Sequence, residues 1–119
     1  MTPERPKPAP SAFSSAVERL RARYRDGSAV LVQEFRELAD RLEADPASLE
    51  PLQTVKDRAH RIRGTAGSYG FARVSELAAA IEREAMRWIS EAEAGRRDGS
   101  TSRAIRDFAA AVEVAFREG

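Results

Sequence analysis

The sequence predicts an all-α fold: an up-and-down antiparallel four-helix bundle with a short additional N-terminal helix that caps it. Apolar residues recur at helical spacing through five segments of the chain. No window alternates apolar and polar residues with the β-branched enrichment that a strand would show. The segments are joined by short connections, which favour antiparallel neighbours. With 119 residues, the chain has the length of a single domain.

The beginning of the chain predicts a flexible tail followed by a short helix. Four of the six prolines lie in the first ten residues, where they remove backbone donors, so residues 1–11 are expected to be a Pro-rich mobile tail and residues 12–119 the helical domain. The expected inward stripe of the first helix is Phe13, Val17, Leu20 and Tyr24. We expect this helix to end at Asp26, with Gly27 in a left-handed conformation.

Four longer helices are expected after this one. The first of them is expected to run from Ser28, its cap, to about Ala44, and the next to begin between Pro46 and Pro51, with Ser48 as its cap, and to end at Gly70. The third is expected to follow Gly70 and to stop near Gly95. The last is expected to begin at Ser100 or Thr101, either of which can cap it. Each of the four helices has a predicted inward stripe. In the first two, the stripes are Leu31, Phe35, Leu38 and Leu42, and then Leu52, Val55, Ala59, Ile62, Ala66 and Tyr69. In the last two, they are Val74, Leu77, Ala78, Ile81, Ala85, Trp88 and Ile89, and then Ile105, Phe108, Val112 and Phe116.

Composition excludes several classes of function. Cysteine is absent and histidine occurs once, so disulfides, the usual zinc sites and a bundle di-metal site are excluded, and no bound metal or cofactor is expected. The net charge of +1 offers no chain-wide field for nucleic acid or an anionic membrane. The longest apolar runs are far shorter than the roughly 20 residues of a membrane span, and no signal architecture precedes them. We therefore expect a soluble, cytoplasmic monomer.

One stretch, Lys56 to Gly70, has an unusual pattern for a helix. It holds three glycines within seven residues, and an interior glycine costs up to about 1 kcal/mol relative to alanine. At about 100° per residue, Gly64 and Gly67 fall within about 40° of His60, on the side opposite the apolar stripe. The single histidine is thus predicted to stand outside the core, on a bare patch that another backbone could approach, with Lys56 and Arg63 beside it.

This arrangement suggests phosphoryl transfer. A neutral imidazole nitrogen is a good nucleophile, and a neighbouring cation can offset the charge of a phosphoryl group. The segment Ala59-His60-Arg61-Ile62-Arg63-Gly64, with Gly70 six residues further on, resembles the histidine-containing phosphotransfer (HPt) family, and Phe71 to Glu82 extends the likeness. That family is a helical bundle that presents its histidine from one helix.

The resemblance implies a role for each residue of the site. His60 is the phosphorylated nucleophile, Arg63 stabilises phosphoryl charge where the family most often has Lys, and Glu82 can hydrogen-bond the imidazole. Lys56, Gly64 and Gly67 belong to the surface on which the partner docks. The partners implied are response-regulator receiver domains and a hybrid or chemotaxis-type histidine kinase, with Mg²⁺ supplied by the receiver. The chain has no Gly-rich nucleotide loop, so we expect a phosphotransfer protein without kinase machinery of its own.

Three functions remain open at this point. The chain is expected to be a phosphorelay intermediate, taking phosphate from one receiver aspartate and passing it to another. Alternatively, it is the phosphoacceptor domain of a chemotaxis-like kinase phosphorylated directly from ATP, or a receiver-binding module that is not phosphorylated. A nucleic-acid binder is disfavoured, because the basic cluster around His60 lacks aromatic stacking partners on the same face.

Overall fold

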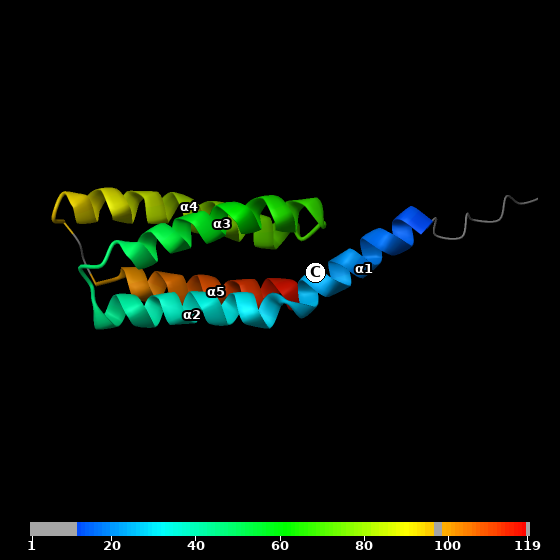
Figure 1. Ribbon diagram of the computed structural model, residues 1–119, viewed down its shortest axis with the longest axis horizontal. Coiled ribbons are helices and arrows are strands. Elements are labelled where there is room, and N and C mark those ends of the chain that lie inside the picture. The colour runs from blue at the N-terminus through cyan, green and yellow to red at the C-terminus, as the bar shows by residue number, and fades with distance from the viewer. Residues whose placement is uncertain (1–11, 97–98, 119) are drawn as a thin grey trace, which may run out of the picture.

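The computed structural model describes residues 12–96 and 99–118, which form an all-helical structure. Its helices are α1 (Ala12–Asp26), α2 (Ser28–Ala44), α3 (Glu50–Ser68), α4 (Ala72–Glu93) and α5 (Thr101–Glu118). Figure 1 shows α2 to α5 side by side with alternating direction, while α1, in blue, projects from the end where α2 begins. These two described ranges contain no strand, so the all-α prediction is confirmed. The predicted tail, residues 1–11, lies outside them.

The core lies among α2 to α5, with α3 packed most extensively on α4 and α2 on α5. Phe35 of α2 and Phe108 of α5 meet edge to face, with ring centroids 4.8 Å apart. Most of the predicted inward residues are buried here, and Leu31, Tyr69, Leu77 and Ile89 are partly buried against them. The fully buried side chains include Phe35, Leu52, Val55, Val74, Ile105 and Val112. Helical periodicity therefore identified the bundle's inner faces correctly.

The junction of α1 and α2 differs from its prediction. Gly27 has φ −78° and is right-handed rather than left-handed. Its N–H donates to the Arg23 carbonyl (3.1 Å) and its own carbonyl accepts from the Leu31 N–H (3.3 Å), so helical hydrogen bonding continues almost through the junction. The first helix thus leads directly into the second instead of stopping at a left-handed turn.

The predicted capping role is not confirmed for α1 as a whole. Phe13 and Leu20, expected to face inward, are 77% and 40% exposed. Only the last turns of the helix contact the bundle end, where the Tyr24 ring lies between those of Tyr69, Phe71 and Phe116, at centroid distances of 5.4, 5.8 and 5.6 Å. The spacing of the apolar residues correctly predicted a helix, but α2 to α5 do not extend far enough to cover Phe13 at the beginning of its apolar stripe.

Two arginines fix how α1 meets the bundle. Arg21 Nε donates to the Tyr69 carbonyl at 2.6 Å. The guanidinium carbons of Arg21 and Arg25 lie 4.8 and 5.3 Å from the centroid of the Phe71 ring, within the range of a cation–π contact. These contacts hold the last turns of α1 against the turn between α3 and α4.

The predicted helix stops are confirmed more fully than the predicted caps. Gly70 and Gly95 have φ of 81° and 73°, the left-handed conformation that glycine adopts without a side-chain clash. The capping predictions for Ser28 and Ser48 were wrong, because the N-cap positions of α2 and α3 are Gly27 and Leu49, and neither makes a side-chain cap hydrogen bond. The first turn of α3 instead contains a proline, which needs no backbone partner there.

Candidate functional site around His60

His60 stands on the outer face of α3. The flanking core residues Ala59 and Ile62 are 0% and 7% exposed, whereas the His60 side chain is 63% exposed. The predicted position of the histidine outside the core is therefore correct. Because the apolar stripe of α3 packs on its neighbours, the opposite face of this helix, including His60, remains available to another molecule.

Glu82 of α4 joins His60 to Arg63. Its Oε2 lies 2.7 Å from His60 Nδ1, and its Oε1 lies 3.1 Å from Arg63 Nη1. The Glu82 side chain is only 13% exposed, while those of His60 and Arg63 are 63% and 48% exposed. One nearly buried carboxylate thus contacts both exposed groups and holds them together on α3.

This contact determines which imidazole nitrogen is free. An ionised carboxylate can only accept hydrogen bonds, so in the neutral ring Nδ1 carries the proton and donates it to Glu82. The other nitrogen, Nε2, then keeps its lone pair. The exposed ring therefore presents a nucleophilic nitrogen, and the adjacent guanidinium provides positive charge.

A recess of about 500 Å³ surrounds the imidazole. The residues that line it are Lys56, Asp57, His60, Arg61, Glu82 and Met86. The recess brings Lys56 together with His60, as the sequence predicted. The carboxylate of Asp57 forms an ion pair with Lys56, with Oδ1 3.9 Å from Nζ. The site is therefore a shallow hollow whose lining residues are mainly ionisable, together with the exposed side chain of Met86.

Comparison with protein-family models identifies the class of molecule. The model described as the Hpt domain matches residues 19–115 of the chain. The chain belongs to the Hpt domain family. Comparisons with curated proteins and with solved structures found no match. The resemblance seen in the sequence from Ala59 to Glu82 is thereby confirmed at the level of the family.

Membership of the Hpt family establishes the general activity. Hpt domains are modules for histidine phosphotransfer in two-component signalling, not kinases. Their partners are response-regulator receiver domains and kinases. In the described parts of this Hpt domain, no three His, Cys, Asp or Glu side chains are grouped as metal ligands, and none of the helices is long and apolar enough to span a membrane.

The two glycines of the Hpt motif have different surroundings. A Cβ built on Gly64 would meet nothing within 4 Å, so this position opens onto free space one turn after His60. A Cβ on Gly67 would lie 3.3 Å from Ser75 Oγ, because α4 approaches α3 there. The missing side chain at Gly64 thus leaves room for another molecule to approach α3, whereas the missing side chain at Gly67 lets α4 pack closely on α3.

Sequence reasoning missed two residues of this Hpt domain. Ser75 of α4 donates a 2.7 Å hydrogen bond to the Arg63 carbonyl, which joins the two helices at the turn that carries the arginine. Met86, 56% exposed, lines the His60 recess. Helical spacing could have indicated Met86, because it follows Glu82 by four residues and so lies on the same face of α4.

Proposed function

We propose that this Hpt domain is a phosphorelay intermediate and that His60 is its phosphoacceptor. His60 takes the phosphoryl group from a phospho-aspartate of one receiver domain and passes it to the aspartate of another. The observation that carries the proposal is the Glu82–His60 contact, which pairs Nδ1 and leaves Nε2 of an exposed ring as the nucleophile.

The transfer step breaks one bond and makes one. The Nε2 lone pair attacks the phosphorus of the acyl phosphate, the N–P bond forms, and the P–O bond to the aspartyl carboxylate breaks with its electron pair going to the carboxylate. The imidazole proton stays on Nδ1, where Glu82 stabilises the positive charge that the ring gains. Transfer to the second receiver is the same step in reverse, with a different carboxylate as acceptor.

Arg63 is suited to stabilise the phosphoryl group. Its contact with Glu82 uses one end of the guanidinium, and the side chain is 48% exposed, so other N–H donors remain for phosphoryl oxygens. A guanidinium presents a planar fork where the family most often has the point charge of a lysine. Its position beside His60 supports a role in offsetting the charge of the transferred group.

The surroundings of His60 support approach by a folded partner rather than by a nucleotide. Gly64 leaves open space along α3, and Lys56 lines the recess beside the ring. The sequence has no nucleotide loop, so the Mg²⁺ and the acyl phosphate arrive with the receiver. Lys56 and Gly64 are therefore proposed as docking residues, while the packing of Gly67 against Ser75 indicates a structural role for that glycine.

Phosphotransfer with a panel of purified receivers from the same cell tests the proposal. Each receiver is phosphorylated on its aspartate and incubated with the full chain or with His60→Gln. We expect acid-labile, base-stable label on the wild-type chain and none on His60→Gln. Unfolding should change by less than about 0.5 kcal/mol, because the ring lies outside the core. Label on the variant would refute the assignment of His60.

A second set of reactions distinguishes the route of phosphorylation. The chain is incubated with ATP alone, and with ATP and each candidate histidine kinase lacking a receiver domain. A relay intermediate is labelled by phosphorylated receivers and not by these kinases. Rapid labelling by a kinase without any receiver would make the chain a direct kinase substrate. Binding to receivers without any label from either source would instead make it a non-phosphorylated docking module.

A further inference from the structure

The first half of α1 carries an apolar surface that the bundle does not cover. Phe13 is 77% exposed and Leu20 40% exposed, and both belong to the stripe that ends at Tyr24. Figure 1 shows this part of the helix extending away from α2 to α5. Isolated apolar side chains on a surface are ordinary, but here they follow one face of a helix at spacings of seven and four residues.

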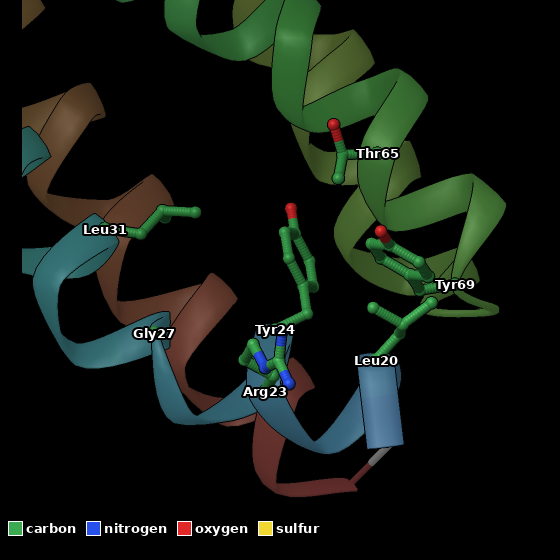
Figure 2. A pocket seen from close by; sticks show the side chains of 7 residues that line it. All are labelled: Leu20, Arg23, Tyr24, Gly27, Leu31, Thr65 and Tyr69. Atoms are coloured by element: carbon green, nitrogen blue, oxygen red, sulfur yellow. The ribbon is translucent and has the colours of Figure 1, made fainter. Parts of the chain in front are cut away.

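The stripe continues into a recess between α1, α2 and α3. Its volume is about 350 Å³, and it is lined by Leu20, Arg23, Tyr24, Gly27, Leu31, Thr65 and Tyr69. Figure 2 shows the Tyr24 ring in the middle, with Leu31 on one side and Thr65 and Tyr69 on the other. We call the stripe and this recess together the α1 surface. It is a long apolar strip with a concave end, a shape that suits a helix better than a flat layer.

Arginines border this strip. At about 100° per residue, Arg23 and Arg19 lie about 60° and 100° to one side of Leu20, while Arg21 and Arg25 lie about 100° and 140° to the other. Arg21 and Arg25 are engaged with Tyr69 and Phe71. Arg19 and Arg23 are exposed and form no ion pair with any described carboxylate.

Several arginines of the bundle are neutralised across helices, whereas Arg19 and Arg23, unpaired within the described ranges, lie beside an exposed apolar stripe. Arg36, Arg58 and Arg106, for example, each have a carboxylate partner on a neighbouring helix. On this edge the Arg19 and Arg23 guanidinium groups are exposed and neither forms an ion pair with a described carboxylate, although Asp26 lies at the end of the same helix. Its electrostatic complement is therefore a negatively charged partner.

We propose that the α1 surface binds an amphipathic helix of a partner protein, with apolar residues that pack along Phe13, Leu20 and Tyr24 and acidic residues that face Arg19 and Arg23. A second copy of this chain fits poorly, because two such stripes would bring unpaired arginines together. An anionic lipid surface fits poorly as well, because a flat layer would not fill the recess. This surface is separate from His60, so the inference does not depend on the phosphotransfer role.

A pair of designed helical peptides tests the proposal. Both have the same leucine stripe, and one carries glutamates and the other lysines along its edges. Fluorescence anisotropy with the full chain should show the acidic peptide binding at least about tenfold more tightly, with a difference that shrinks as ionic strength rises. Arg19→Glu/Arg23→Glu and, separately, Phe13→Ser/Leu20→Ser should each weaken binding of the acidic peptide by about tenfold or more.

Matched variants separate this surface from general effects of charge and hydrophobicity. Arg83→Glu/Arg103→Glu changes the net charge equally at exposed arginines on α4 and α5, and Val114→Ser removes an exposed apolar side chain from α5. Both should bind like wild type, as should His60→Gln. Circular dichroism confirms that each variant remains helical.

Several results would overturn the proposal. They are equal affinity for the two peptides, no binding of either, and equal weakening by the matched controls. Sedimentation showing a dimer that requires Phe13 and Leu20 would make a second copy the occupant. Tighter binding of the chain to phosphatidylglycerol vesicles than to the acidic peptide, lost in Arg19→Glu/Arg23→Glu, would make a membrane the occupant.

Discussion

Glu82 lies twenty-two residues after His60, and its Oε2 is 2.7 Å from the imidazole Nδ1. The carboxylate is supplied by α4, is nearly buried at 13% exposure, and also contacts Arg63. The orientation of an exposed ring on one helix is therefore set by a nearly buried carboxylate on the next. Any displacement of α4 along α3 would change the pairing of the ring nitrogens.

The first prediction concerns this contact. Glu82→Ala removes the acceptor of the Nδ1 proton, so the Nδ1–H tautomer should become less populated and the rate of phosphorylation should fall about tenfold, the effect of losing one charge-assisted hydrogen bond at a partly exposed site. Glu82→Gln keeps an acceptor oxygen and should lose less. Nitrogen NMR of the imidazole reports the tautomer, and labelling kinetics report the rate. An unchanged tautomer in Glu82→Ala would contradict the assignment.

Arg63 is expected to act through its charge. Arg63→Lys keeps a cation beside His60, so transfer should remain within a few-fold of wild type. Arg63→Gln removes the charge and should slow transfer about tenfold or more. Stability should change by less than about 0.5 kcal/mol in both, since the side chain is half exposed. Arg103→Gln on α5 is the matched control, and equal slowing in that variant would show a general effect of net charge.

Substitutions at Gly64 should have separate effects on the stability of the domain and on docking of a receiver. Gly64→Ala adds a methyl group into open space within a helix and should stabilise the domain by about 0.4 to 1 kcal/mol. Gly64→Gln should also fold, but its side chain would occupy the approach to His60 and slow transfer from a receiver far more than reaction with acetyl phosphate. Chemical denaturation and parallel labelling reactions measure the two effects. Equal loss with both donors would indicate damage to the imidazole's surroundings instead.

Gly67→Ala should behave differently from Gly64→Ala. Its new methyl group would lie 3.3 Å from Ser75 Oγ, a hydroxyl held by its bond to the Arg63 carbonyl. We expect little or no gain in stability from this substitution in the wild-type chain. In a Ser75→Ala background the crowding is relieved, and Gly67→Ala should then stabilise by up to about 1 kcal/mol. Identical effects in the two backgrounds would show that Ser75 does not limit this position.

Tyr24 provides a test of the contact between α1 and the bundle. Its hydroxyl is buried and has no hydrogen-bond partner among the residues that the structure describes, and burial, followed by the charge of Tyr69, raises the pKa of Tyr24. Tyr24→Phe removes an unsatisfied polar group while keeping the ring, so it should leave stability at neutral pH unchanged or increase it by up to about 1 kcal/mol. Thermal unfolding measures this change.

The same residue predicts an alkaline effect. The folded protein holds the Tyr24 proton to higher pH than the unfolded chain does. Stability should therefore decline as the pH rises from the ordinary tyrosine pKa, about 10, through the raised pKa of the folded state. Tyr24→Phe should lack this part of the decline. Matching pH profiles for the two proteins would show that Tyr24 ionises equally in both states.

The sequence alone determined the helical class, the inner faces of α2 to α5 and the exposed position of His60. These properties depend on local periodicity: residues such as Val55, Ala59 and Ile62 must share one face of a helix, and His60 must then lie on another. The positions of Gly70 and Gly95 as helix stops follow from backbone freedom, which is also local. The motif from His60 to Gly64 likewise needed only spacing.

Tertiary structure decided the properties that depend on how helices meet. Spacing marked Gly64 and Gly67 as equivalent, and only the approach of α4 showed that one is open and the other is packed against Ser75. Phe13 and Tyr24 belong to the same stripe, yet one is exposed and the other is packed in an aromatic cluster, because burial depends on where the bundle ends. The family resemblance pointed to Glu82 as a partner for His60, but the 2.7 Å contact itself depends on the register of α4 against α3, which the packing of their side chains sets.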